Sequence, residues 1–455
     1  MTQAQPPKPH ARRGRASLWR FIRDFRSDIL SAQSERLYSA WMAEFRSPLI
    51  HSFTCNDPAL IDLILRRRPL DFPKSPRMAA GLTPLLGNSS FISNGEVWQH
   101  QRRIIDPAFE GGRLRQAFPP MKAAAEAAVA RLAPVADGRE IDIEREASHV
   151  TADVIFRTLF SIAIEDQTAQ QVFTTFRAHQ DSQPMVNAGS LLGLPRWLHF
   201  HSRKTRRTAA RIRALIGDLV AERAKQIASE NAPDDLATKI MTTPDPKTGR
   251  TFSHAEMIDE VATFFLAGHE TSASALAWAL FLLGENPEWQ DRIVAEGVAN
   301  EFSETRNLEA ARAVFREALR LYPPVAMTVR ECAQSEQLRD RKAGKGAQLV
   351  LSPFHLHRHQ RLWERPDEFD PGRWKTANGK QCMRDAYIPF SAGPRACPGA
   401  GFAMIEVPLL LARIIAAYRI TPAATRPVPV MRLTLRGAAG IRLCLTPRAP
   451  DGQSR

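Results

Sequence analysis

Cys397 is the residue whose setting most clearly suggests chemistry. It lies in PFSAGPRACPG, where Gly393 and Gly399 permit close backbone approach and two prolines stiffen the turn. The thiolate, rather than the thiol, binds metals, and cations or free N–H groups nearby favour it. Arg395 supplies a cation, and the apolar stretch that follows predicts a buried helix whose first N–H groups can point at the sulfur. The stretch indicates a metal ligand, against the simpler alternative of an inert cysteine in a helix-entry turn.

Two other pairs of residues occur at helical spacing. Glu317 and Arg320 are three residues apart in FREALR, and Trp98 and Arg102 are four apart in WQHQR. At these spacings both members of a pair share one helix face and can act together. Alone, the first pair would most often be a surface salt bridge. A further arginine, Arg373, follows in FDPGRW.

The segment from Ser253 to Gly284 predicts one long helix through the centre of the protein. Ser253 and Glu256 form a capping box, and Gly284 supplies the stop. The ~30 residues between them would span ~45 Å, and they are apolar almost all round, as in a buried helix. The central AGHET, residues 267–271, contains poor helix formers, which hints at function. It is not the zinc motif HExxH, because residue 273 is alanine.

The remaining elements predict a mostly α protein with a minor β portion. Residues 308–322 form a second helix before two prolines, and short extended pieces follow it. Near the C-terminus, VMRLTLR (430–436) and IRLCLTP (441–447) alternate like strands of a small sheet. These elements would hold the central helix and the Cys397 turn in place.

The full spacing Phe390-x-x-Gly393-x-Arg395-x-Cys397-x-Gly399 resembles the heme-binding loop of the cytochrome P450 family. The ExxR pair, the WxxxR pair and the AGHET segment occur in that family's order. The resemblance implies a cytochrome P450 fold, with heme b between the long central helix and the helix after the Cys loop. It also implies a monooxygenase, which places one atom of O2 in an organic substrate.

The resemblance assigns roles to particular residues. Cys397 would be the axial ligand of the heme iron, with Phe390 beside the sulfur. Cations and an indole would bind the heme propionates, namely Trp98, Arg102, Arg330 and Arg395. Ala267 and Gly268 would leave room for dioxygen, and Thr271 and Glu270 would deliver protons. Glu317, Arg320 and Arg373 would form a buried structural triad.

The resemblance also places a substrate pocket. Its predicted lining comes from the central helix and from the strand after the ExxR helix, namely Phe264, Leu266, Ala267, Val325, Ala326 and Met327. Segments 81–91 and 186–198 resemble the mobile parts over such a pocket. Their apolar character favours a lipophilic substrate, and a fatty acid, a terpenoid and a steroid all remain open.

The charge favours an acidic protein partner. The chain has 62 basic and 48 acidic residues, a net charge of +14, and its arginines are spread along its length rather than gathered in a nucleic-acid-binding tail. The chain ends soon after the C-terminal strands, which leaves no room for a fused reductase. We therefore expect a separate ferredoxin, or a flavodoxin, with its reductase, and no nucleic acid.

The N-terminus and the cysteines bear on location. Residues 1–16 are expected to be disordered and basic, and 17–455 to form a single catalytic domain. Leu18, Ile22, Phe25 and Ile29 recur at helical spacing, which fits a helix packed on the core or, alternatively, one on a membrane surface. No uncharged apolar run is long enough to cross a membrane. Five scattered cysteines fit a reducing cytoplasm, so we expect a cytoplasmic enzyme without a transmembrane anchor.

Three alternatives stay open at this point. The chain could be a peroxide-using or rearranging heme-thiolate enzyme, although Glu270 and Thr271 argue against it. It could instead be a heme sensor or carrier that catalyses nothing. Finally, HLHRH (355–359) could bind a metal, although packing in a loop is the more common role of such histidines.

Overall fold

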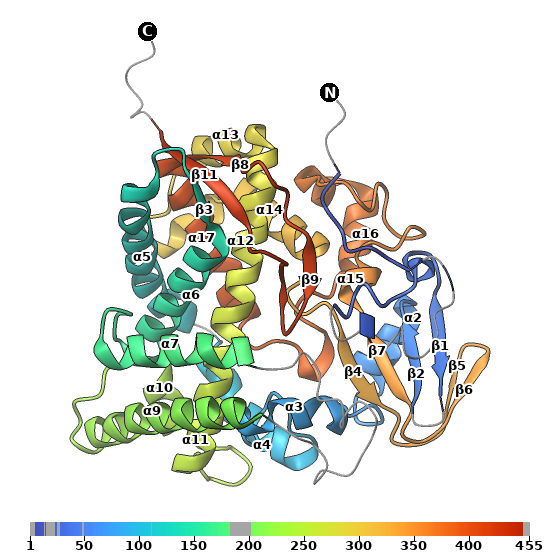
Figure 1. Cartoon of the computed structure of the whole chain (residues 1–455). Coiled ribbons are helices and arrows are strands. Elements are labelled where there is room, and N and C mark those ends of the chain that lie inside the picture. Colours follow the sequence, from blue (N-terminus) through green and yellow to red (C-terminus); the bar gives the residue numbers. More distant parts are fainter. Residues whose placement is uncertain are drawn as a thin grey trace.

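The helices dominate the protein and surround one long central helix (Figure 1). The computed structural model describes residues 5–12, 14, 23–24, 28–47, 50–110, 112–182 and 202–448. Its α-helices are α2 (Pro58–Asp62), α3 (Pro76–Leu86), α4 (Gly95–Ile105), α5 (Arg113–Leu132), α6 (Ile143–Phe160), α7 (Gln167–Ser182), α9 (Arg203–Ala228), α10 (Leu236–Thr242), α11 (His254–Phe264), α12 (Glu270–Glu285), α13 (Pro287–Glu296), α14 (Glu309–Leu321), α15 (Pro353–Leu356), α16 (Ala377–Asp385) and α17 (Ala400–Ala417).

Short helical turns connect several of these helices. Two are π-helices, η2 (Leu63–Arg67) and η6 (Phe265–His269). The others are 3-10 turns, namely η1 (Glu35–Tyr38), η3 (Asp106–Ala108), η4 (Ala133–Val135), η7 (Phe302–Asn307), η8 (Pro371–Lys375) and η9 (Gly393–Arg395).

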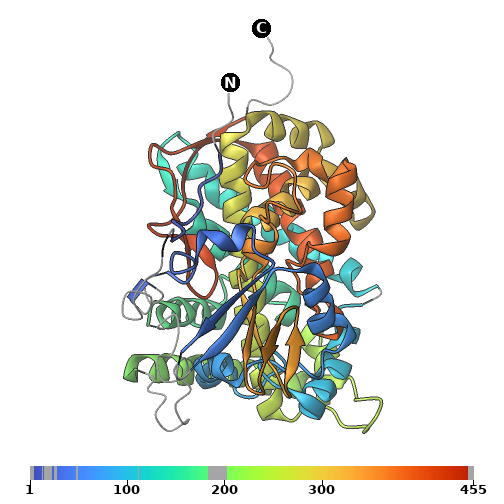
Figure 2. The ribbon, with the colours of Figure 1, turned by 90° about the vertical axis from the view of Figure 1, so that its right-hand side faces the viewer.

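The strands form one sheet of four, one of three and two hairpins. The four-stranded sheet has the order β1-β2-β7-β4, in which only β2 and β7 are parallel. It faces the viewer in Figure 2, where blue strands lie beside orange ones from far along the chain. The strands are β1 (Met42–Arg46), β2 (His51–Cys55), β3 (Glu140–Asp142), β4 (Thr328–Glu331), β5 (Glu336–Leu338), β6 (Arg341–Ala343), β7 (Gln348–Leu351), β8 (Tyr418–Pro422), β9 (Pro429–Met431), β10 (Leu435–Gly437) and β11 (Arg442–Pro447).

The predicted central helix runs from His254 to Glu285 as α11, η6 and α12. Ser253 and Glu256 form the predicted capping box. The five-residue π-helix η6 interrupts the α-helical pattern at FLAGH. Such π-bulges add one residue to a turn and are frequent at functional sites. The AGHET segment therefore lies where the helix geometry changes.

The C-terminal strands differ in one respect from the prediction. Residues 430–436 do not form one strand, because the chain turns between Met431 and Leu435 and makes the hairpin β9–β10. The segment 441–447 does form a strand, β11, which lies between β3 and β8. An alternating pattern cannot reveal a tight turn that contains neither glycine nor proline.

The helix after the Cys loop, α17, is a core helix. It packs against α5, α14, α12 and α13, and it continues through Pro408. Among the described residues it is the one helix long and apolar enough to cross a membrane, but 56% of that stretch is buried inside the fold. Its side chains belong to the largest hydrophobic cluster, which also contains much of α12.

Part of the N-terminal segment contacts the rest of the fold. The hydroxyl of Tyr322 donates to the carbonyl of Pro7 at 2.7 Å, and Lys8 pairs with Asp367 at 2.7 Å. These contacts lie within residues 1–16, which were expected to be disordered. The N-terminal helix pattern at Leu18, Ile22 and Phe25 lies outside the described residues.

Candidate functional site

The Cys397 loop is a tight turn that requires glycine. The N–H of Cys397 donates to the carbonyl of Phe390 at 2.9 Å. Gly393, at the start of η9, has a φ of +67°, and a Cβ there would lie 1.9 Å from the carbonyl oxygen of Leu65 in η2. Only glycine permits both this φ and this approach. The loop is therefore pressed against η2, and the sulfur lies just before α17.

Opposing influences act on the thiol of Cys397. Burial is the largest and raises its pKa, whereas the backbone N–H of Gly399 and the guanidinium of Arg102 lower it. The residue is nonetheless exposed, so protein surrounds the sulfur but an open space reaches it. A bound metal ion favours the thiolate. This arrangement fits a metal ligand better than an inert core cysteine.

Helix α4 carries two predicted cofactor residues and is tied to the Cys loop. Arg102 donates from Nη1 to the carbonyl of Ala396, the residue before Cys397, at 2.8 Å. The guanidinium of Arg395 lies 4.0 Å from the centre of the Trp98 ring. A pocket of about 570 Å³ opens here and is lined in part by Trp98 and Arg395. The rest of the lining comes from residues 67–71, Gln99 and Pro394, and Cys397 is not part of it. The structure thus brings Trp98 and Arg102 of α4 into contact with the Cys loop.

Lys74, which the sequence analysis missed, joins the predicted propionate arginines in one group. It forms an isolated β-bridge with Arg330. Burial first, and then Arg395, Arg330 and Arg102, hold its pKa well below the ordinary 10.5. Burial also lowers the pKa of Arg330 to about 10 and that of Arg395 to about 9. No local pattern marks this single lysine. We call Lys74, Arg102, Arg330 and Arg395 the cation cluster.

The cation cluster has too few anionic partners of its own. Arg330 is 4% exposed, and its Nε and Nη1 have no hydrogen-bond partner among the described residues. Asp106 pairs with Arg102 at 2.6 Å. Buried cations without acceptors are costly, and the two carboxylates of a heme would supply them. The residues therefore fit a dianionic cofactor beside Cys397.

The predicted triad forms a closed ionic network. Glu317 accepts from Arg320 at 2.8 and 3.0 Å and from Arg373 at 3.0 Å. All three side chains are at most 3% exposed. The remaining guanidinium N–H groups donate to backbone carbonyls of residues 357–368. The network fastens α14 to the irregular segment that leads toward the Cys loop.

A stripe of partly exposed residues runs along the central helix. Phe264, Ala267, Gly268 and Thr271 are partly exposed, whereas most of their neighbours are buried. Their spacing of three and four residues places them on one helix face, which is consistent with an open space beside the helix. Leu266 corrects the predicted lining, because helical rotation turns it into the core, where it is 7% exposed.

The strand residues predicted to line the pocket alternate. Val325 and Met327 are partly exposed, but Ala326 is fully buried and its carbonyl accepts from Ser352 at 3.0 Å. Successive residues of an extended chain point to opposite sides. Ala326 therefore belongs to the core rather than to the lining. Segment 186–198, predicted to cover the pocket, lies outside the described residues.

Gly268 has a packing role beside any role toward oxygen. A Cβ at Gly268 would lie 2.6 Å from Cδ1 of Ile155 in α6. The glycine thus allows α6 to approach η6 closely. Thr271 donates from its hydroxyl to the carbonyl of Ala267, one turn earlier. That hydroxyl must leave this bond before it can donate elsewhere.

Glu270 is bound on both oxygens. It is 3% exposed. Oε1 accepts from Thr434 at 2.8 Å and pairs with Arg436, and Oε2 accepts from Gln180 of α7. The sequence analysis did not identify these partners, because they come from the β9–β10 hairpin and from α7. A route from solvent to Glu270 would pass Arg436, whose side chain is 32% exposed.

The histidine run at 355–359 packs rather than binds a metal. His355 bonds to Ser352 at 2.8 Å, and His357 accepts from the N–H of Ile388 at 2.9 Å. Burial lowers the pKa of both histidines to about 3, so both are neutral. In the part of the chain that the structure describes, no group of three or more His, Cys, Asp or Glu could hold a metal ion.

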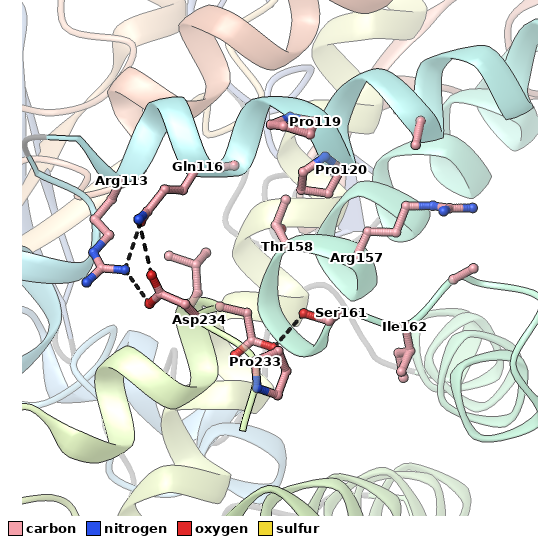
Figure 3. Close-up of a pocket in the computed structure, with 15 residues that line it drawn as sticks. Arg113, Gln116, Pro119, Pro120, Arg157, Thr158, Ser161, Ile162, Pro233 and Asp234 are labelled. Atoms are coloured by element: carbon pink, nitrogen blue, oxygen red, sulfur yellow. Dashed lines mark hydrogen bonds and ion pairs between the residues drawn. The ribbon is translucent and has the colours of Figure 1, made fainter. Parts of the chain in front are cut away.

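A second pocket lies away from all predicted site residues. It has a volume of about 550 Å³ and lies among α5, the end of α6 and the loop before α10 (Figure 3). Arg113 pairs with Asp234 at 2.6 Å, and Ser161 donates to Asp235 at 2.9 Å. The charged side chains Arg113, Asp234 and Asp235 thus already have partners within the protein, so these contacts do not indicate an ionic ligand.

Comparisons with known proteins agree with this geometry. A family model described as cytochrome P450 matches residues 34–445. Cyclooctatin synthase of Streptomyces melanosporofaciens is 31% identical over 435 residues, which cover 89% of this chain and 92% of that protein. Cyclooctat-9-en-7-ol 5-monooxygenase of the same organism is 33% identical over 354 residues, 76% of this chain and 74% of that one.

A solved structure gives the same fold. The crystal structure of the cytochrome P450DA heme domain covers 98% of both chains with a TM-score of 0.81, at 23% identity. That likeness establishes a mostly α architecture of the same kind. The family match extends over most of the chain and implies a heme iron cofactor. The chain therefore belongs to the cytochrome P450 family and is a monooxygenase of that family.

Proposed function

We propose that this enzyme binds heme b through Cys397 and uses O2 to oxidise a lipophilic substrate, with electrons from a separate ferredoxin or flavodoxin. The observation that carries the proposal is the cation cluster beside Cys397, in which Arg330 has buried N–H groups without acceptors. A heme supplies the missing carboxylates, and when bound it supplies oxygen activation and substrate oxidation.

The protein residues provide binding and orientation. Cys397 ligates the iron, and Phe390 packs beside the sulfur. Trp98, Arg102, Arg330, Arg395 and Lys74 hold the propionates. The triad of Glu317, Arg320 and Arg373 keeps the segment before the Cys loop fixed. Because these groups are set in place by bonds within the protein, little reorganisation accompanies cofactor binding.

The central helix moves protons. Thr271 exchanges its bond to the carbonyl of Ala267 for one that donates into the open space beside the helix. Glu270 would take up a proton from solvent as its carboxylate leaves Arg436 or Gln180, turn inward and pass that proton on, and it would return as the carboxylate. Gly268 lets the helix lie close to α6. The movements of Thr271 and Glu270 let protons reach the site while bulk water stays out.

The substrate is lipophilic. Phe264, Ala267, Val325 and Met327 are apolar, and they are partly exposed where a substrate would lie. The two Streptomyces relatives are named for cyclooctatin and for an unsaturated alcohol, cyclooctat-9-en-7-ol. These names support a terpenoid-type alcohol as the first substrate to test, before fatty acids and steroids.

The partner is acidic and separate. The chain's net charge of +14 favours an acidic electron donor. Its bacterial relatives support a cytoplasmic location for both proteins. Both ferredoxin and flavodoxin should be tried, each with its reductase.

The first experiment is the absorption spectrum of the dithionite-reduced protein with and without carbon monoxide. Thiolate-ligated heme gives a strongly red-shifted Soret band, which Cys397→Ala should abolish. Turnover of cyclooctat-9-en-7-ol with ferredoxin, reductase and O2 comes next. Thr271→Ala should keep the band but release peroxide in place of product. A shifted band without substrate-linked O2 consumption would point to a heme sensor, and turnover by peroxide alone to a peroxide-using enzyme.

A further inference from the structure

Asp245 is a fully buried carboxylate in an otherwise polar, proline-rich loop. The loop joins α10 to α11, and Asp245 is 0% exposed. Its own turn supplies part of its bonding, because the N–H of Lys247 donates to it at 2.9 Å and the hydroxyl of Thr248 at 3.1 Å. A buried carboxylate needs cationic partners as well, and here they come from a different part of the chain.

Those partners lie on α4. Arg103 donates to both carboxylate oxygens of Asp245, at 2.6 and 2.8 Å, and Nδ1 of His100 bonds to it at 2.7 Å. Hydrogen bonds from Arg103 are the largest of the influences that hold the pKa of Asp245 well below its usual range. The α10–α11 loop is therefore fastened to α4 by a bidentate ion pair with Arg103 and by a hydrogen bond with His100.

The two faces of α4 have different tasks. Successive residues are about 100° apart around an α-helix, so Trp98 and Arg102 share one face while His100 and Arg103 share the roughly opposite face. The first face meets the Cys loop, since Arg102 donates to Ala396. The second face meets Asp245. The helix thus lies between the Cys loop and the α10–α11 loop.

The other contacts that fix α4 come from its inner face and its C-terminal end. Its last two residues, Ile104 and Ile105, enter the hydrophobic core. Within the described chain, its substantial backbone packing against a regular element is with η3, which directly follows it. On the inner side of α4, Trp98 is 7% exposed, and the buried Gln101 bonds to the hydroxyl of Ser93 at 2.5 Å and to the carbonyl of Asn88 at 2.7 Å. These contacts hold one side of the helix. The bidentate pair of Arg103 with Asp245 fixes the opposite side in direction as well as in distance.

We propose that Asp245 is a positioning residue for the cofactor, which clamps the outer face of α4 so that Trp98 and Arg102 on the inner face stay directed at the heme propionates. The proposal rests on the proposed cofactor role of Arg102. Asp245 itself does not touch the cofactor. It acts through Arg103 and His100, in the way that outer partners commonly orient the groups that hold a metal or cofactor.

The test measures heme release from the ferric holoenzyme to excess apomyoglobin, together with the reduction potential of the iron. Asp245→Asn keeps the shape of the side chain but removes its charge. Heme release should become about tenfold faster, which is the lower end of the effects seen when the outer partners of ligand-holding residues are replaced. The potential should fall, because a propionate that is less well neutralised stabilises the ferric form. A purely structural role would lower the melting temperature of the apoprotein without moving the potential.

The chain offers matched controls. Asp234→Asn removes a carboxylate that pairs with Arg113 of α5 at 2.6 Å in the pocket of Figure 3, and this carboxylate is 63% exposed. It should leave release and potential unchanged. Arg103→Gln removes the other partner of the same ion pair. Because the side chain of Arg103 is 25% exposed, the glutamine can bond to water, and this variant replaces Asp245→Asn if that protein does not fold. The double variant should release heme no faster than the worse single variant, because both remove one interaction.

The outcomes separate the clamp from the cofactor site. If Asp245→Asn and Arg103→Gln release heme at the Asp234→Asn rate while Arg102→Gln releases it faster, the clamp is overturned and the site stands. If Arg102→Gln also leaves release unchanged, the proposed role of Arg102 is overturned, and the clamp with it. Faster release and a lower potential in both clamp variants, without additivity, support the proposal.

Discussion

The triad and the cation cluster are both buried groups of arginines, but only the triad is complete. In the triad, Glu317 and several backbone carbonyls accept from all three guanidinium nitrogens of both Arg320 and Arg373. In the cation cluster, Arg330 leaves two nitrogens without acceptors among the described residues. Arg320, Arg373 and Arg330 are all at most 4% exposed, so the difference is not one of burial.

The difference separates structural charge from ligand-binding charge. A network that the protein satisfies by itself stabilises the fold whether or not a cofactor is bound. A buried cation without acceptors, as Arg330 is at two nitrogens, costs stability until an anion binds, and so indicates where the anion binds. The comparison predicts that substitutions in the triad harm the apoprotein and the holoprotein alike, whereas substitutions in the cation cluster affect them in opposite directions.

The largest expected effect comes from Glu317→Gln. Two buried guanidiniums lose their carboxylate, which should cost about 3–5 kcal/mol of unfolding free energy. Urea unfolding should show this loss in both the apoprotein and the holoprotein. Glu309→Gln is the matched control, because its pair with Lys375 at 3.6 Å is exposed and should be worth less than about 1 kcal/mol. A loss confined to the holoprotein would assign the triad to the cofactor.

The second effect comes from Arg330→Met. In the apoprotein the change removes a buried cation from beside three others, so the melting temperature should rise. In the holoprotein it removes a propionate partner, and heme release to apomyoglobin should become about tenfold faster, equivalent to ~1.4 kcal/mol. A lower melting temperature in the apoprotein would contradict the view that the cluster is incomplete.

The third effect is a pH dependence at Lys74. Its pKa in the folded apoprotein lies below the ordinary 10.5, so between the two values the unfolded chain binds more protons than the folded one. Stability of the apoprotein should therefore rise with pH through that window. Heme should weaken the rise, because its propionates favour the charged lysine. Urea midpoints measured across the window should show the rise in the native apoprotein and lose it in Lys74→Met.

The smallest effect comes from Trp98→Phe. The indole lies under the guanidinium of Arg395 at 4.0 Å, and a phenyl ring keeps the apolar contact but is the weaker partner for a cation. The weaker cation–ring contact should cost about 0.5–1 kcal/mol. That energy corresponds to heme release about two to five times faster. Because this contact is also present without heme and Trp98 is 7% exposed, the urea midpoint of the apoprotein should fall by a comparable energy. An unchanged midpoint would contradict the energy assigned to the contact.

The predictable parts of the site are those carried by local spacing. Helical spacing predicted a helix at Trp98 and Arg102 and another at 308–322, and a capping box and a glycine stop predicted the one from Ser253 to Gly284; the structure has helices at 95–105, 309–321 and 254–285. The loop at Cys397 was identified from its own eleven residues. The exposed stripe through Phe264, Ala267, Gly268 and Thr271 also follows from helical geometry once the helix is known.

Other parts could not be predicted, because their partners are distant in the chain. Lys74 carries no signal in PKSPR, and it joins the cation cluster only because it pairs with β4 at Arg330. Arg436 lies in a segment that was expected to be one strand but makes a hairpin, and so reaches Glu270. Leu266 and Ala326 were predicted to line the pocket but are buried in the core. To exclude them, one needs to know which side of the helix and of the extended segment faces the pocket.

By itself, the sequence predicted the chemistry of this protein, because the cysteine loop and the helix spacings are local patterns that can be recognised without knowledge of the fold. Only the tertiary structure decided which charges are paired and which stay open. Whether a buried arginine has acceptors for its N–H groups depends on backbone carbonyls and side chains from distant parts of the chain. The same holds for Asp245 on α4, for Lys74 beside Arg330 and for Arg436 on Glu270. Burial then makes the unpaired ones costly, which is why they indicate the site of an anionic cofactor.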